Sequence, residues 1–224
     1  MIASDIITAA FGLAGNASLD ATAGLAKLNR ILDKLYRHKF SWQRLTASVV
    51  FTAGAAYNTA QWDTRFLDFY EAEDGTVGRY TDPNGSGILS PTGLSYRQYI
   101  NIRDRLTSIG QPRNVAADTV GGRWYVYPLG DITRTIDIDF YQLPAAIAAS
   151  GTPLWSSHAS DDILVDLLKT WAYEWQDDQR LDGAIMRAVG DLGAYRRKDQ
   201  AKEGVTHQTA LDERVFRRVA SWDC

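Results

Sequence analysis

The stretch Thr133-Arg-Thr-Ile-Asp-Ile-Asp-Phe-Tyr141 decides the class of the fold. Every second residue from Ile136 to Phe140 is apolar, and Asp137 and Asp139 lie between them. Successive side chains of a strand point to opposite faces, so the apolar residues share one face and the carboxylates the other. The stretch therefore predicts a half-buried β-strand in the middle of the chain.

Three other segments of the middle region also have the composition of strands. They are residues 45–52, 62–70 and 122–128, which are rich in β-branched and aromatic side chains. The turn Leu129-Gly-Asp131 predicts a hairpin that joins the last of these to the strand at 133–141. Residues 73–93 contain five glycines and two prolines, which predicts a long loop or an elaborate hairpin tip.

The prolines separate this region from the two ends of the chain. All six lie between Pro83 and Pro153, so residues 1–82 and 154–224 lack the residue that breaks helix interiors. The two ends are free to be helical, and the middle is not.

Apolar side chains at steps of three and four predict four amphipathic helices in these ends. Ser4 and Ser18 are the expected N-caps of the two N-terminal helices, and Ser160 is that of the first C-terminal helix. The second C-terminal helix is expected to end at Arg196-Arg-Lys198.

The order helices, strands, helices predicts an α+β fold. The economical way to bury the apolar faces of the terminal helices is to pack them on one another. We therefore expect a discontinuous helical bundle formed by the N- and C-terminal helices, at residues 1–40 and 146–199. An antiparallel β domain at 41–145 is inserted into it, and an extended C-terminal tail follows at 200–224.

Composition excludes several classes of protein. The chain has 224 residues and a net charge of -3, which is not the charge of a strongly basic protein that coats DNA. Its one cysteine, Cys224, excludes a disulfide framework or a cysteine-based zinc site within a single chain. No segment approaches the ~18 apolar residues of a membrane span. We expect a soluble protein from a reducing compartment, or one that needs no disulfides.

Residues with the pattern of a catalytic or metal site are few. The chain has no phosphate-binding, dinucleotide-binding or serine-hydrolase motif. Asp82-Pro-Asn-Gly-Ser-Gly87 is similar to a calcium loop, but Gly93 replaces the final carboxylate, so a plain turn is expected. Asp177, Asp178 and Asp182 form a carboxylate cluster that is expected to be a solvated corner with local arginines. We expect no catalytic, cofactor-binding or metal-binding residues.

Seven tryptophans are the less ordinary part of the composition. Trp171 and Trp175 are one helical turn apart, which predicts a pair in the bundle core. Trp62, Trp124 and Trp155 are interpreted as subunit contacts, because tryptophan is enriched at protein interfaces.

Five elements occur in a characteristic order along residues 20–200. They are a helix with Leu28-Asn-Arg-Ile-Leu32 followed by Trp42; Gly54 and Tyr57 before Trp62-Asp-Thr-Arg-Phe-Leu67; Ile109-Gly-Gln-Pro-Arg113; Tyr127-Pro-Leu-Gly-Asp131 leading to Ile138-Asp-Phe-Tyr141 and Leu143-Pro144; and a helix at 161–175 followed by a second amphipathic helix. This order resembles the head-to-tail adaptor (connector) proteins of tailed bacteriophages, a group that includes tail tubular protein A. The loop at 73–93 is longer and richer in glycine than in the simplest members.

The resemblance implies a structural virion protein of the neck, assembled in the host cytoplasm, and not an enzyme. A ring of about a dozen copies would dock beneath the portal protein and contact neighbouring subunits and a downstream neck or tail protein. DNA would pass through its channel without sequence-specific binding, and no membrane is involved. The C-terminal segment of the family reaches into the portal. The implied portal-binding residues are Arg196, Arg197, Lys198, Val215, Phe216, Arg217, Arg218 and Trp222.

A second interpretation stays open from the residues alone. A cell-wall-directed hydrolase or glycan-binding module would use exposed tryptophans and the carboxylates of Asp177, Asp178 and Asp182.

Overall fold

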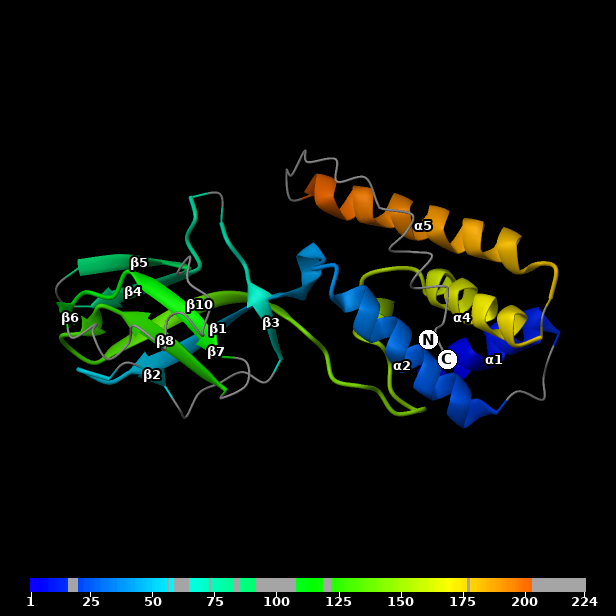
Figure 1. The fold of residues 1–224 in the computed structure, drawn as a ribbon, viewed down its shortest axis with the longest axis horizontal. Coiled ribbons are helices and arrows are strands. Elements are labelled where there is room, and N and C mark those ends of the chain that lie inside the picture. The colour runs from blue at the N-terminus through cyan, green and yellow to red at the C-terminus, as the bar shows by residue number, and fades with distance from the viewer. Residues whose placement is uncertain are drawn as a thin grey trace. The chain divides into compact units, whose positions relative to one another are not determined.

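The computed structural model describes residues 1–15, 20–55, 57–58, 65–72, 74–82, 85–91, 108–118, 122–176 and 178–202. The fold is α+β, with helices at the beginning and end of this order and strands between them (Figure 1). The chain divides into two compact units. They are a helical unit of Met1–Trp42 and Pro144–Cys224, and a β unit of Gln43–Leu143.

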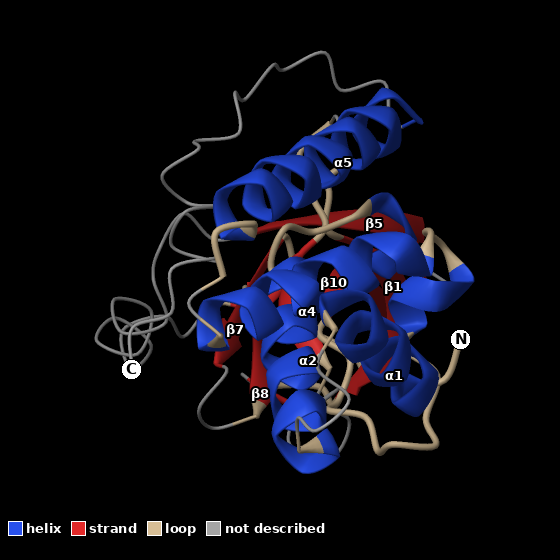
Figure 2. Ribbon diagram, turned by 90° about the vertical axis from the view of Figure 1, so that its right-hand side faces the viewer, coloured by secondary structure: helices blue, strands red, loops and turns tan. Residues whose placement is uncertain are grey.

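The helical unit is organised around one helix. Its elements are α1 (Ala3–Ala14), α2 (Ala21–Tyr36), α4 (Asp161–Trp175) and α5 (Leu181–Lys202), with a short 3-10 turn at Leu154–Ser157. Helix α4 packs against α1, α2 and α5 (Figure 2). The fully buried side chains between the helices include Ile6, Leu28, Ile31, Leu164 and Leu168. Burial of each such side chain stabilises the fold by roughly 1.5–3 kcal/mol, so this core holds the unit together.

Helices α1 and α2 approach each other most closely at Gly24. A Cβ atom there would lie 2.8 Å from Cζ of Phe11 and 2.9 Å from Cγ2 of Ile7. Both distances are below van der Waals contact, so any side chain would push the two helices apart. Glycine is therefore required at this crossing.

Side chains cap α2 and α4. Ser160 accepts a hydrogen bond from a backbone N–H in the first turn of α4, as predicted. Asp20 caps α2 in the same way, whereas the predicted cap, Ser18, lies outside the described residues. The prediction that Ser4 caps α1 is wrong, because that helix already begins at Ala3.

The β unit is a curled mixed sheet. Its strands are β1 (Arg44–Phe51), β2 (Tyr57–Asn58), β3 (Phe66–Phe69), β4 (Gly78–Asp82), β5 (Gly85–Pro91), β7 (Asn114–Asp118), β8 (Arg123–Tyr127) and β10 (Arg134–Gln142). Their order is β1-β10-β4-β5-β7-β8-β2, and β3 also pairs with β10. A separate pair joins β6 (Ile109–Gly110) to β9 (Leu129–Gly130). The prediction of an antiparallel domain is wrong for two pairs, because β5–β7 and β6–β9 are parallel.

Strand β10 is the alternating stretch from which the fold was inferred. Its apolar residues Ile136, Ile138 and Phe140 are fully buried in the core of the sheet. On the opposite face, Asp137 and Asp139 accept hydrogen bonds from hydroxyl groups of β1, each at 2.5 Å. One face of β10 therefore packs in the apolar core, and the other face forms polar hydrogen bonds with the neighbouring strand.

The predicted hairpin at Leu129-Gly-Asp131 is wrong. Strand β8 pairs with β7 and β2, whereas β10 pairs with β1, β3 and β4. The backbone N–H groups of Leu129 and Asp131 instead donate to the carbonyl oxygens of Ser108 and Gly110. Because residues 108–110 accept the hydrogen bonds of the turn, β8 and β10 do not pair with each other and occupy different positions in the sheet.

The glycine-rich segment forms the hairpin β4–β5, one of the two structures expected there. The carboxylate of Asp82, at the end of β4, accepts a hydrogen bond from the buried guanidinium of Arg134. Arg134 also pairs with Asp131, and this hydrogen bond holds the pKa of Asp131 below its usual value. Asp82 is thus engaged in an ion pair. No group of three His, Cys, Asp or Glu side chains in the described part of the chain is placed to hold a metal.

The burial of three tryptophans differs from what the sequence predicted. Trp155 and Trp124 are 0% and 1% exposed in the cores of the two units, so their interpretation as subunit contacts is wrong. Trp175 is 70% exposed, so its assignment to the bundle core is wrong. The ring of Trp171, one turn earlier in α4, lies 6.0 Å from that of Phe11 of α1, so the first tryptophan of the pair contacts the bundle and the second is exposed. Trp62 lies outside the described residues.

No described helix is both long and apolar enough to cross a membrane.

The contrast between Trp155 and Trp175 is testable by unfolding. Trp155→Ala is expected to lower the free energy of unfolding by about 3–5 kcal/mol, because it leaves a large cavity. Trp175→Ala is expected to change it by less than about 0.5 kcal/mol, because the side chain is exposed. Urea unfolding followed by circular dichroism at helical wavelengths measures both, and equal losses would contradict the assignment of Trp155 to the core.

Candidate interaction surfaces at the two ends of α5

An aromatic cluster of Phe40, Trp42, Trp155, His158 and Tyr195 holds the C-terminal half of α5 in the helical unit. The ring of Trp155 lies 5.3 Å from that of Phe40 and 5.1 Å from that of Tyr195. Trp42 stacks between Phe40, at 5.4 Å, and His158, at 4.7 Å. Nε1 of Trp42 donates to the hydroxyl of Tyr195 at 3.0 Å, and this hydroxyl donates to the carbonyl oxygen of His158 at 3.1 Å. Each aromatic pair contributes about 0.5–1.5 kcal/mol beyond simple burial, so this half of α5 is firmly placed.

Asp199 extends this attachment by one further helical turn. Its buried carboxylate accepts two hydrogen bonds from Ser41, one from the backbone N–H at 2.8 Å and one from the hydroxyl at 2.6 Å. A buried charge without such partners would be costly. The pairing therefore fixes α5 against the segment that follows α2.

The predicted residues Arg196, Arg197 and Lys198 lie between these two attachments. Arg197 and Lys198 are exposed, because the half-buried Tyr195 and the buried Asp199 on either side face the helical unit and direct the intervening side chains outward. Arg196 is half-buried. It faces His38, whose pKa is lowered by burial and, to a smaller extent, by the charge of Arg196. The structure thus separates two solvent-facing cations from one that packs against its own unit.

The other predicted residues of this set lie outside the described residues. They are Val215, Phe216, Arg217, Arg218 and Trp222.

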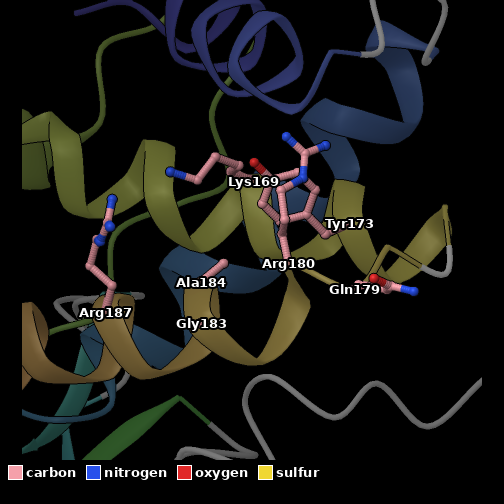
Figure 3. Close-up of a pocket in the computed structure, with 7 residues that line it drawn as sticks. All are labelled: Lys169, Tyr173, Gln179, Arg180, Gly183, Ala184 and Arg187. Carbon is pink, nitrogen blue, oxygen red and sulfur yellow. The ribbon is translucent and has the colours of Figure 1, made fainter.

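A groove of about 350 Å³ lies at the other end of α5, where it begins beside α4 (Figure 3). The residues that line it are Lys169, Tyr173, Gln179, Arg180, Gly183, Ala184 and Arg187. The guanidinium of Arg180 lies 4.6 Å from the ring centre of Tyr173, and Lys169 pairs with Asp166. The groove therefore has an aromatic and aliphatic floor with cationic groups around it.

The family model described as SU10 adaptor protein matches residues 1–218 of the chain. The chain belongs to this family of phage head-tail adaptors. No curated protein matches the chain. The adaptor is a structural component of the virion at the junction of head and tail, and the hydrolase interpretation is set aside because this family is not enzymatic.

The carboxylates that supported the hydrolase interpretation are not arranged as a catalytic pair among the described residues. Asp178 accepts hydrogen bonds from the guanidinium and the backbone N–H of Arg180, at 2.6 Å and 2.8 Å. These bonds lower the pKa of Asp178 to about 2, so its carboxyl group is a poor proton donor near neutral pH. Asp182 is exposed in the first turn of α5, and Asp177 lies outside the described residues.

Sequence reasoning did not predict the groove of the adaptor. Its residues come from α4, α5 and the connection between them, and they form no motif. One signal was available in Gly183, because glycine inside a helix costs roughly 0.5–1 kcal/mol relative to alanine. A Cβ atom at Gly183 would meet no other atom within 4 Å, so packing within the helical unit does not require glycine there.

The pKa of Asp178 provides a test of the connection between α4 and α5. Its carboxyl group is expected to titrate near pH 2, and Arg180→Ala is expected to return the pKa toward the ordinary 3.8. Because the pKa is lower in the folded chain, the pair stabilises the fold above about pH 4 and loses this contribution as the pH falls through about 2. Carbon-detected NMR titration measures the pKa, with Arg187→Ala as the control that leaves it unchanged. If the pKa of Asp178 is unchanged in the Arg180→Ala variant, the assigned pairing between Asp178 and Arg180 is wrong.

Proposed function

We propose that the adaptor forms a ring, of about twelve copies, beneath the portal, extends the DNA channel and joins the head to the neck or tail. The observation that carries the proposal is the family match over residues 1–218. The firmly held end of α5, with Arg197 and Lys198 exposed, supplies a surface for the portal contact.

Within this proposal the terminal helices act as one discontinuous bundle, at residues 1–40 and 146–199. The packing of α4 against α1, α2 and α5 supports it. The β-rich region at 41–145 is the inserted domain. Helix α5 continues to Lys202, beyond the predicted end at Lys198, so the part of the proposed tail 200–224 that reaches the portal follows Lys202.

The basic turn of α5 suits a repeated contact with an acidic surface. Cations near a helix C-terminus interact favourably with the helix dipole, so Arg197 and Lys198 are compatible with a stable helix. One pair of exposed charges gives weak binding by itself. The same pair repeated around a ring gives a strong contact, because all copies engage the portal together.

The low net charge of the adaptor fits a passage for DNA. Strong binding to phosphates scales with the number of neutralised charges, and it would hold DNA in place. A net charge of -3 per chain leaves the molecule without a general affinity for DNA.

Reversal of the exposed charges tests the portal contact. The double variant Arg197→Glu, Lys198→Glu is expected to weaken portal binding by about tenfold or more, because it places repulsion where attraction is proposed. Arg30→Glu, on the exposed side of α2, is the matched control and should bind normally. Biolayer interferometry with immobilised portal measures the dissociation constants. Equal binding by the double variant and the control would remove Arg197 and Lys198 from the contact.

Truncation tests the tail. A chain that ends at Lys202 keeps the whole of α5 and the hydrogen bonds between Asp199 and Ser41. We expect it to fold normally but not to dock, since the tail residues proposed to reach the portal are missing. Light scattering with and without portal reports docking as a gain in mass that only the full-length adaptor shows. Undiminished docking of the truncated chain would contradict the role of the tail.

A further inference from the structure

Trp175 presents most of an indole ring to water at the end of α4. It is 70% exposed and has a ring neighbour in Trp171, 6.2 Å away between ring centres. An exposed apolar surface of this size is unfavourable in an isolated molecule. Tryptophan is also the residue type most enriched among the side chains that dominate the energy of protein interfaces. Trp175 therefore has the properties of an anchor for a partner.

The groove beside α5 lies on the other side of the same helix. Tyr173, in its floor, is two residues from Trp175, and two residues of an α-helix are about 200° apart. Trp171 and Trp175 lie on the side where Phe11 of α1 packs, whereas Tyr173 faces α5. The exposed indole and the groove thus point in nearly opposite directions.

The chemistry of the groove fits an indole better than an anion. Lys169 and Arg180 already pair with Asp166 and Asp178, so their charges are largely neutralised for a phosphate. Among the described residues Arg187 has no carboxylate partner, and its side chain is exposed. Cationic groups around an apolar floor still attract the face of an aromatic ring, and tryptophan gives the strongest cation–π interaction. The absence of a side chain at Gly183 leaves room for such a ring.

We propose that Trp175 of one copy of the adaptor inserts into the α4–α5 groove of the next copy. The proposal rests on the proposed ring and names a contact within it. Because the indole and the groove face opposite ways, one pair of copies satisfies one such contact and leaves an indole and a groove free. The contact therefore repeats from copy to copy in a head-to-tail manner, and such a contact generates a ring where the rotation between copies closes, as the proposed ring requires.

Two substitutions separate the partners of this contact. Trp175→Ala removes the indole, and Gly183→Leu fills the groove without meeting another atom at its Cβ position. Each variant alone is expected to lose self-association. An equimolar mixture is expected to stop at dimers, because it retains one intact indole and one intact groove per pair. Gly183→Ala is the control, since it adds a methyl group and should assemble as the unchanged chain does.

Cross-linking gives the decisive measurement on the full-length adaptor with Cys224→Ser. Gln176→Cys lies beside the indole, and Asp191→Cys lies one turn of α5 beyond Arg187; both positions are exposed. With a short bismaleimide, a mixture of the two single-cysteine variants is expected to give a cross-linked dimer, with or without portal. Adding Trp175→Ala to the Gln176→Cys chain should abolish this dimer.

The outcomes distinguish this contact from the ring beneath the portal. Absence of the 176–191 product overturns the contact, even where rings form with portal. Cross-linking between two Gln176→Cys chains also overturns it, because that product requires two-fold pairing. A 176–191 product without any ring beneath the portal supports the contact and overturns the proposed function.

Discussion

The burial of Trp155 is the interaction on which the helical unit depends. Its ring lies between Phe40, which follows α2, and Tyr195 of α5. Its Nε1 donates to the carbonyl oxygen of Ser160, the N-cap of α4, and its backbone N–H donates to the hydroxyl of Tyr36. One residue therefore joins the end of α2, the start of α4 and the second half of α5, and both its backbone N–H and its indole N–H have acceptors.

This attachment makes the two ends of α5 different. The C-terminal half is held by the aromatic cluster and by the hydrogen bonds between Asp199 and Ser41. The first turns lie beside α4 with a groove between them, and Gly183 contributes no side chain to close it. One end of the helix is thus rigid enough to present charges in a fixed position, and the other is open enough to accept a side chain. Both proposed contacts of the adaptor follow from this asymmetry.

Local patterns predicted the elements, but contacts distant in sequence decided their partners. The alternation in β10 and the cap at Ser160 need only neighbouring residues, and both were predicted correctly. The hairpin after β8 was predicted wrongly because the N–H groups of its turn donate to the carbonyl oxygens of Ser108 and Gly110, which are distant in sequence. Trp155 and Trp175 are the same residue type in helical surroundings. Their burial differs because Phe40 and Tyr195, distant in sequence, pack around Trp155, whereas Trp175 has Trp171 of its own helix as a ring neighbour, and no local pattern around either tryptophan indicates these partners. The groove was missed for the same reason.

Pairing within the chain explains how a protein of low net charge can still offer a basic contact. Arg134, Arg180 and Lys169 each have an aspartate partner in the fold, and so they add little to the field outside the molecule. No described carboxylate pairs with Arg197 or Lys198, and these two are adjacent on the exposed side of one helix turn. Their charge is local, so it is available to a protein surface that meets this turn. It is also too limited in extent to follow a DNA backbone, which requires cations spread along its length.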